Sequence, residues 1–399
     1  RDQPRSRGLG DVYKRQGVIS NRCTYSTLSW FGHLSPPVLR WRVSGILVSA
    51  AGRNERERSE PDKSDVYTVR ICTQLPYVKR RKMTMNKEIL FLNPVFTHNI
   101  WGGTKLREEY GYDVEGDDIG ECWGVAAHEN GNCTVKNGEF AGQTLADLWD
   151  SHRELFGGID GVRFPLLIKI IDAKDDLSIQ VHPDDAYAAE HENGSFGKME
   201  CWYILDCKED STLVIGHNAR TKEELCDMIE GKKWKEFIRE IPVKKGDFIQ
   251  IDPGTVHAIK GGITLLETQQ NSDITYRVYD YDRLSNGKPR DLHVKQSIDV
   301  ITVPAKPVED SVISVKADKA NELCELISCK YYTVYKLDVE GKAELNVGDK
   351  PFLIMSVVAG SGTVDGNAIK KGDHFILPNG YSNPVFEGNM EIVASTVSK

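Results

Sequence analysis

The chain has 399 residues, of which 40% are hydrophobic and 28% are charged, a composition ordinary for a soluble globular protein with room for two or three cores. No apolar run approaches the roughly 20 residues of a membrane-spanning helix, which excludes a transmembrane protein of that kind. The nine cysteines are scattered without a Cys-x-x-Cys pair, and they therefore indicate reduced thiols in a cytoplasmic protein and not a disulfide framework.

Charge divides the chain at Met83. Residues 1–82 contain 17 Lys and Arg against 7 Asp and Glu, whereas the rest contains 34 against 52. The segment shows no sustained period of 2 or 3.6 residues, and we interpret it as disordered or as translated upstream sequence, with the native protein starting at Met83 or Met85. The alternatives are a targeting peptide, which its acidic residues disfavour, and a basic nucleic-acid arm, which the lack of aromatic residues interleaved with its basic run disfavours.

From residue 89 onward, short apolar runs bounded by Gly, Pro, Asn and Asp are typical of strands. The expected strands lie within 90–103, 120–127, 163–185, 201–206, 211–217 and 243–270. Helical spacing of apolar residues predicts helices at 104–111 and 144–156, a helical insert at about 218–242, and a helix that starts near Leu292. The fold class we predict is therefore mainly β with a small helical insert.

One pattern occurs twice. KKGDFIQIDPGTVHAI begins at Lys244 and KKGDHFILPNGYSNPV begins at Lys370, and both contain the same entry, a strand and a Pro/Gly turn. Repetition of such a corner predicts two small antiparallel barrels, which we place at residues 83–300 and 301–399. In an ungapped alignment His257 of the first copy falls on Asn383 of the second, so we expect the second barrel to be metal-free.

Four residues of the first barrel have the chemistry of metal ligands. Gln180 and His182 are two apart on an expected strand, so their side chains project to the same face. Glu200 and His257 begin two further strands, and imidazole nitrogens combined with carboxylate and amide oxygens suit a borderline divalent ion. Each residue alone is weak support, since a lone histidine on a strand is more often a surface or core residue, but the joint pattern predicts a metal site.

The same residues carry a resemblance to a known family. A His and Glu pair followed by Gly-Asp-x5-Pro-Gly-x-x-His is similar to the motifs of cupins, and a wider set of motifs resembles the bacterial type I mannose-6-phosphate isomerases of the shorter, Gram-positive kind. That set comprises NPVF, IWGG, GECW, SIQVHPDD, KMECWY, PGTVHA and ETQQNSDITYRVYD. It runs from about Leu92 to the C-terminus and does not cover residues 1–82.

The resemblance implies two cupin-type jelly-roll barrels and an aldose–ketose isomerase that interconverts mannose 6-phosphate and fructose 6-phosphate. It also implies one zinc ion per chain, and the ligands that match by position are Gln180, His182, Glu200 and His257. The family's active-site arginine matches Arg277. Two further matched residues are Lys198, two positions before Glu200, and Glu267, ten positions before Arg277.

An aldose–ketose isomerase moves a proton between C1 and C2 and stabilises the enediol or enediolate that forms between them. Proton transfer needs a carboxylate or imidazole within hydrogen-bond reach, for which Glu267 and Asp273 are the candidates. The developing charge needs a metal or a fixed cation, which Arg277 can supply. The sequence has no phosphate-binding glycine loop, so discrete basic side chains, with Lys198 as a candidate, must hold the substrate phosphate.

Other interpretations stay open. An iron cupin oxygenase uses similar ligands, and a non-catalytic sugar-binding cupin needs no acid–base residues. Arg277 can instead pair with Asp280 or Asp282 on its own loop, and Glu267 can simply anchor a hydrogen-bond network. The expected partner is a small sugar phosphate, with no nucleic acid and no membrane, and we expect a cytoplasmic monomer or homodimer.

Overall fold

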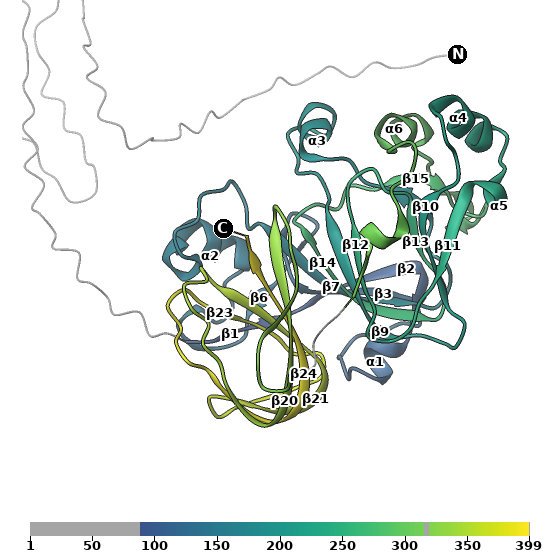
Figure 1. The fold of residues 1–399 in the computed structure, drawn as a ribbon. Helices are drawn as coiled ribbons and strands as arrows, with labels where there is room; N and C mark the ends of the chain where they lie inside the picture. Colours follow the sequence, from purple (N-terminus) through teal and green to yellow (C-terminus); the bar gives the residue numbers. More distant parts are fainter. Residues whose placement is uncertain (1–87, 315–318, 399) are drawn as a thin grey trace, which may run out of the picture. The chain divides into compact units, whose positions relative to one another are not determined.

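The computed structural model describes residues 88–314 and 319–398, so the predictions for residues 1–82 lie outside the described part of the chain. The described residues are mainly β, as predicted, and most strands belong to three antiparallel sheets (Figure 1). None of the helices in these ranges is long and apolar enough to cross a membrane. The seven cysteines in these ranges are all free.

Two of the sheets enclose the predicted metal ligands. The seven-stranded sheet has the order β18 (Val312–Ile313), β12 (Phe248–Ile251), β9 (Glu200–Asp206), β14 (Ile263–Gln270), β7 (Leu166–Ala173), β2 (Val95–Gly103), β3 (Ile119–Val125). The five-stranded sheet has the order β11 (Ile238–Pro242), β10 (Thr212–His217), β13 (His257–Ile259), β8 (Ile179–Val181), β15 (Tyr276–Tyr279). Side chains of both sheets, including Ile204 and Leu213, share one apolar cluster, so the pair is an open, jelly-roll-like sandwich.

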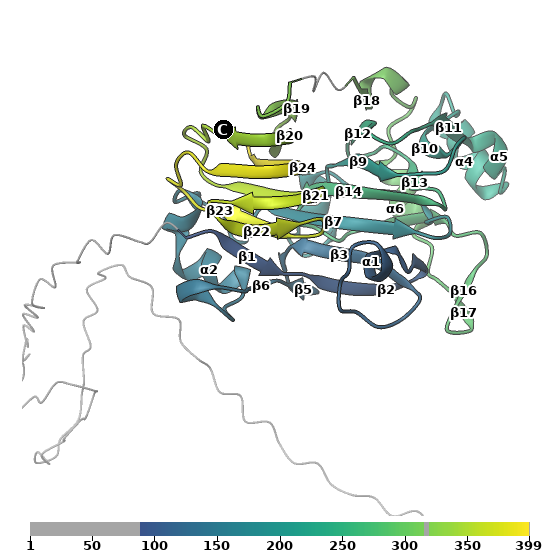
Figure 2. The same cartoon turned by 90° about the horizontal axis from the view of Figure 1, so that it is seen from below.

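The third sheet is built mainly from C-terminal residues. Its order is β19 (Cys324–Ser328), β20 (Tyr332–Glu344), β24 (Val385–Val397), β21 (Leu353–Val364), β23 (His374–Leu377), β1 (Leu90–Asn93), β6 (Thr134–Val135), and β22 (Asn367–Lys370) pairs with β21. Figure 2 shows the blue β1 beside the yellow β23. Because β1 and β6 join this sheet and β18 joins the seven-stranded one, the sheets exchange strands across residue 300. The domain division at that residue stays a prediction.

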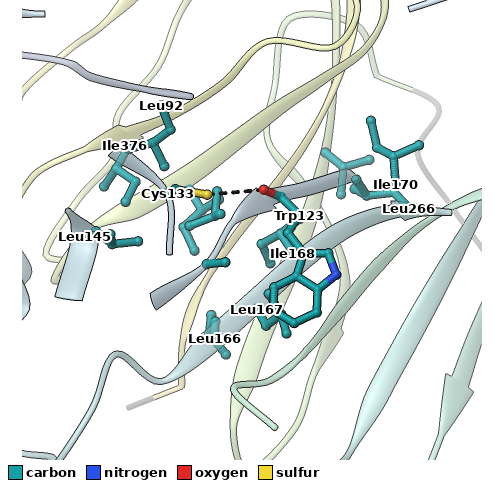
Figure 3. Close-up of a cluster of buried hydrophobic side chains, with 14 of the residues drawn as sticks. Leu92, Trp123, Cys133, Leu145, Leu166, Leu167, Ile168, Ile170, Leu266 and Ile376 are labelled. Atoms are coloured by element: carbon teal, nitrogen blue, oxygen red, sulfur yellow. Dashed lines mark hydrogen bonds between the residues drawn. The ribbon is translucent and has the colours of Figure 1, made fainter. Parts of the chain in front are cut away.

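Strand β7 is buried along its whole length because both of its faces are covered, which explains its nearly unbroken apolar sequence. On one face, Ile168 and Ile170 pack in a cluster with Leu92 and Ile376 of the third sheet (Figure 3). On the other face, Ile171 belongs to the cluster inside the sandwich. Between Ile168 and Ile171, successive side chains of β7 therefore alternate between the face toward the third sheet and the face toward the interior of the sandwich.

The helices are short and lie between strands. Helix α2 (Leu145–Ser151) starts where Thr144 Oγ1 accepts a hydrogen bond from Asp147 N, and the 3-10 helix η2 (Arg153–Phe156) continues to Gly157, whose φ of +74° ends the helical segment. The other helices are α1 (Lys105–Glu108), α3 (Asp185–His191), α6 (Val294–Val300), η1 (Gly138–Phe140) and η3 (Val308–Asp310). Two hairpins complete the fold, namely β4 (Ala127–His128) with β5 (Gly131–Asn132), and β16 (Leu284–Ser285) with β17 (Lys288–Pro289).

The helical insert predicted at about 218–242 is wrong at its C-terminal end. Helix α4 (Lys222–Glu230) ends at Gly231, and α5 (Trp234–Phe237) adds a single turn. The next five residues form strand β11, in which Ile241 lies opposite Leu213 of β10. Pairing with β10 provides hydrogen bonds for the backbone of this segment. The spacing of apolar residues along the sequence cannot predict such a contact with a distant strand.

The repeated Lys-Lys-Gly-Asp motif forms the same turn in both copies. Asp247 Oδ2 accepts a hydrogen bond from Lys244 N (2.9 Å), and Asp373 Oδ2 accepts one from Lys370 N (2.8 Å). The glycines inside the two turns have φ values of +88° and +90°, a left-handed conformation that strains other residues. Each turn leads into a strand, β12 or β23, so the predicted repeat is confirmed.

Candidate metal centre and active site

Three of the predicted ligands meet inside the sandwich. His182 follows β8, Glu200 begins β9 and His257 begins β13, and their donor atoms all lie within 4.8 Å of one another. All three residues are at most 1% exposed. Within residues 88–314 and 319–398, no other group of His, Cys, Asp and Glu side chains converges in this way.

Hydrogen bonds to the backbone decide which nitrogen of each histidine faces the centre. His182 Nδ1 lies 2.8 Å from the carbonyl oxygen of Ile274, and His257 Nδ1 lies 2.9 Å from that of Thr255. Each Nδ1 therefore carries the proton, and each Nε2 presents a lone pair. The two Nε2 atoms are 3.1 Å apart, so their lone pairs repel each other unless a cation lies between them. Backbone-anchored histidines of this kind are typical of metal sites.

Glu200 adds negative charge to this pair. Its Oε1 lies 3.3 Å from His257 Nε2 and its Oε2 lies 3.5 Å from His182 Nε2. Burial, reinforced by Glu267, raises the pKa of Glu200 to about 7, and burial lowers the pKa of His257 to about 4. The environment thus disfavours both a bare carboxylate and a protonated imidazole. A divalent cation relieves both penalties, so the residues present fit a metal ion.

Gln180 and Lys198 border the same centre. Gln180 lies opposite His257 in the β8–β13 pair, and its amide nitrogen is 3.3 Å from His257 Nε2. Turning the amide over places Oε1 there as a fourth oxygen or nitrogen donor. Lys198 Nζ lies 2.9 Å from Glu200 Oε2 and 3.2 Å from His182 Nε2. Lys198 is therefore buried at the metal end of the site.

A second charged group lies beside the ligands, and it contains two residues that sequence analysis missed. Lys169 of β7 is 4% exposed, and its Nζ lies 3.5 Å from Glu267 Oε1 and 3.6 Å from Glu121 Oε2. The sequence does contain a signal for Lys169, because it is the single cation within the apolar run LLIKIIDA, and lysine is almost never fully buried without a partner. Glu121 has no comparable signal.

Glu267 is held as a carboxylate. Burial by itself raises the pKa of this group, but Lys198 and Lys169 outweigh burial, and the pKa lies below its ordinary value. Trp202 Nε1 also donates a hydrogen bond to Glu267 Oε2 (3.0 Å). Glu267 therefore does anchor a network, and its Oε1 still accepts no hydrogen bond from the described residues.

A cavity of about 270 Å³ is lined by residues of both groups, although His182, Glu200 and His257 are not among its lining residues. Its walls include five predicted site residues, Gln180, Lys198, Glu267, Asp273 and Arg277, and the three unpredicted residues Lys169, Glu121 and Arg290. Asp273 accepts a hydrogen bond from Asn130 and lies 3.5 Å from His128 Nε2. The volume is close to the lower end, about 300 Å³, of the usual range for small-molecule sites.

Arg277 reaches the cavity without a carboxylate partner among the described residues. Its Nη1 donates to the carbonyl oxygen of Asp291 (2.9 Å), and its Nε is buried without a hydrogen-bond partner. Burial and the neighbouring Arg290 lower its pKa. The alternative in which Arg277 pairs with Asp280 is wrong, because the Asp280 carboxylate binds Arg283 and Arg290, at 2.6 and 2.5 Å.

The position of Arg290 could not be read from the sequence. Its Nε and Nη2 both bond to Asp280, a residue that is 3% exposed. This two-point contact orients the guanidinium beside Arg277 on the cavity wall. Two adjacent guanidinium groups repel each other, and a cavity that contains both is suited to an anion.

Comparison with known proteins agrees with this geometry. The family description "Phosphomannose isomerase type I, catalytic domain" matches residues 89–196, and the description "Mannose-6-phosphate isomerase, cupin domain" matches residues 322–397. The mannose-6-phosphate isomerase ManA of Bacillus subtilis is 50% identical over 316 residues, which cover 78% of this chain and 99% of the relative. A mannose-6-phosphate isomerase of Streptococcus mutans is 46% identical over 313 residues, which cover 77% and 98%.

Solved structures show the same relationship. The crystal structure of a mannose 6-phosphate isomerase from Bacillus subtilis superposes with a TM-score of 0.72 at 47% identity and covers 77% of this chain and 99% of its own. A protein from Archaeoglobus fulgidus, at 21% identity and a TM-score of 0.62, shares the fold and covers 78% of this chain and 98% of its own. The resemblance inferred from the motifs is thus confirmed, and the chain belongs to the type I phosphomannose isomerases, a family of enzymes with a cupin domain.

Proposed function

We propose that this chain is a zinc-dependent mannose-6-phosphate isomerase, which interconverts mannose 6-phosphate and fructose 6-phosphate through an enediol intermediate. The observation that carries the proposal is the buried pair of Nε2 lone pairs, 3.1 Å apart and flanked by Glu200. Lys198 Nζ lies 3.2 Å from one of them, His182 Nε2, but a cation between the two nitrogens would bind both lone pairs and the Glu200 carboxylate, and a set of nitrogen and oxygen donors suits zinc. The isomerases of Bacillus subtilis and Streptococcus mutans support the same substrate for this chain.

The ligands would be His182, Glu200, His257 and Gln180. When bound, zinc supplies Lewis acidity toward a sugar oxygen and stabilises the negative charge that develops there. Lys198, 2.9 Å from Glu200 Oε2, places a second positive charge at the same end of the cavity. We assign Lys198 to the stabilisation of the enediolate, because a fixed cation in a buried site acts strongly on a nearby developing charge.

We assign proton transfer between C1 and C2 to Glu267. Its Oε1 has a free lone pair, and the two lysines keep the carboxylate ionised, so it can accept a proton from the substrate. In Asp273, the other candidate base, both oxygens have neighbours, since Oδ2 accepts a hydrogen bond from Asn130 and Oδ1 lies 3.5 Å from His128 Nε2. Lys169, which lies 3.5 Å from Glu267, holds the position of the carboxylate during the transfer.

We assign the substrate phosphate to Arg277 and Arg290. Both guanidinium groups line the cavity, and Arg277 has donors that no described carboxylate uses. Lys198 and Lys169 each pair with carboxylates at the metal end, whereas Arg290, although it pairs with Asp280, lies beside Arg277 on the cavity wall. The arginines are therefore the better candidates for a dianionic phosphate. The geometry therefore supports exchanging the two roles suggested by the sequence, with Lys198 at the enediolate and Arg277 at the phosphate.

A coupled assay tests the proposal directly. The full chain is incubated with mannose 6-phosphate, and fructose 6-phosphate is measured before chelation, after chelation and after zinc is returned. We expect activity that disappears with the chelator and returns with zinc. Iron in the purified protein together with oxygen uptake would instead support an oxygenase, and sugar binding without turnover would support a binding protein.

A further inference from the structure

The third sheet contacts the segment that carries the active-site lysine. Tyr331 lies immediately before β20, and its hydroxyl donates a hydrogen bond of 2.6 Å to Asp185 Oδ2. Lys330 Nζ lies 3.3 Å from the same oxygen. Asp185 is the first residue of α3, in the connection between the ligand-bearing strands β8 and β9. A carboxylate three residues after the candidate ligand His182 is thus bound by two residues of the C-terminal sheet region.

The other oxygen of Asp185 holds the segment around Lys198. Asp185 Oδ1 accepts hydrogen bonds from Gly197 N (3.0 Å) and from Gln270 Nε2 (2.9 Å). Gln270 Oε1 in turn accepts one from Met199 N (2.9 Å). The backbone amides on both sides of Lys198 are therefore held by this one network.

The approach of the segment to α3 is close. A Cβ atom on Gly197 would lie 2.4–2.5 Å from backbone atoms of Asp184 and Asp185, so only glycine allows this contact. The four donors around Asp185 match the roughly four acceptor positions of a carboxylate. With every position used, the carboxylate has one favoured orientation, and that orientation places Oδ1 on Gly197 N.

We propose that Tyr331, acting through Asp185, is a positioning residue for Lys198 and Glu200, so that the C-terminal sheet contributes to the active site although it supplies no metal ligand. The inference concerns residues 197–200 and rests on the proposed function for the roles of zinc and Lys198. Loss of the Tyr331 hydroxyl leaves Asp185 Oδ2 with only the longer contact to Lys330 (3.3 Å), so Oδ2 can turn toward solvent, since the side chain of Asp185 is 39% exposed. That rotation weakens the contact of Oδ1 with Gly197 N.

The test compares Tyr331→Phe with Tyr381→Phe. Tyr381 is a matched control because its hydroxyl also donates a 2.6 Å hydrogen bond to an aspartate, Asp365, but on a part of the third sheet that has no bond to the 197–200 segment. Both variants of the full chain lose one tyrosine–aspartate hydrogen bond. A general loss of stability should therefore appear in both variants, whereas an effect on the active site should appear only in Tyr331→Phe.

Three measurements follow the segment and its function. In the metal-free, substrate-free chain, we expect the amides of residues 197–200 to exchange hydrogen about tenfold faster in Tyr331→Phe than in Tyr381→Phe. By chelator competition, we expect the zinc dissociation constant of Tyr331→Phe to rise about three- to tenfold, less than the loss of a direct partner of a ligand causes. We expect kcat to fall by about the same factor while KM for mannose 6-phosphate changes less than about twofold.

Asp185→Asn provides the second variant. If Tyr331 acts through Asp185, adding Tyr331→Phe to Asp185→Asn changes the exchange rate and kcat by less than about twofold. Equal amide exchange in Tyr331→Phe and Tyr381→Phe would overturn the inference, as would additive effects in the double variant. The exchange measurement does not depend on turnover, so it decides the inference even if the chain proves inactive toward mannose 6-phosphate, a result that counts against the proposed function alone.

Discussion

Replacing Lys169 with methionine tests whether one buried cation organises the carboxylates of the active site. Methionine keeps an unbranched apolar chain in a fully buried strand and removes the charge. In the native protein Lys169 Nζ lies between Glu267 and Glu121, at 3.5 and 3.6 Å. The substitution therefore leaves two carboxylates without the cation that they share.

The expected cost follows from this geometry. Removing one partner of a buried ion pair typically costs about 3–5 kcal/mol. We expect about 3 kcal/mol, the lower end of this range, because each carboxylate keeps one hydrogen bond, from Trp202 to Glu267 and from Trp123 to Glu121. Lys169 is also one of the two lysines that lower the pKa of Glu267, so that pKa rises in the variant. A base with a raised pKa is protonated up to a higher pH, so we expect kcat to fall and the acidic limb of the pH profile to shift to higher pH, with recovery of kcat as the pH rises.

Urea unfolding and the pH profile of kcat separate these two effects. The matched control is Lys336→Met, because Lys336 lies between Asp338 (2.7 Å) and Glu391 (3.7 Å) in the third sheet, with 15% of its side chain exposed. The control should lose stability and keep the native pH profile. A Lys169→Met enzyme with native kcat and an unshifted acidic limb would refute the reasoning.

Three further predictions concern the phosphate site, acid stability and the metal. In steady-state kinetics, Arg290→Met should raise KM for mannose 6-phosphate about 10- to 100-fold with little change in kcat, since a charge-assisted hydrogen bond contributes about 1.5–3 kcal/mol. Arg283 is the other partner of Asp280 but does not line the cavity, so Arg283→Met should show no such effect. Burial lowers the pKa of His374 to about 3, so between that value and the unfolded pKa of about 6.5 only the unfolded chain binds this proton. As the pH falls from 6 to 4, the free energy of unfolding measured with urea should therefore decrease by about 1.4 kcal/mol per pH unit more in the native protein than in His374→Gln. His257→Gln should retain less than about a tenth of the zinc of the native protein after dialysis, because a catalytic zinc site depends on each of its few protein ligands, and native zinc content would remove His257 from the ligand set.

Local rules applied to the sequence were sufficient for most of the strands and for the candidate metal ligands. A period of two residues places Gln180 and His182 on one face of a strand whatever the surrounding fold. The Lys-Lys-Gly-Asp turn is also local, because its aspartate bonds to a backbone amide three residues away and its glycine supplies the left-handed φ. The family motifs then connected these pieces to a type I phosphomannose isomerase, which the comparisons confirmed.

Contacts between distant segments decided the rest. Strand β11 forms because Ile241 finds Leu213 across the sheet, and Lys169 enters the cavity because β7 packs its other face on the third sheet. Arg290 lies beside Arg277 on the cavity wall because the Asp280 carboxylate binds the Arg290 guanidinium there. The sequence by itself therefore determined which residues could bind a metal. Only the tertiary structure decided which charges neutralise each other and which stay free for a substrate, since that depends on distances between side chains that sequence spacing does not set.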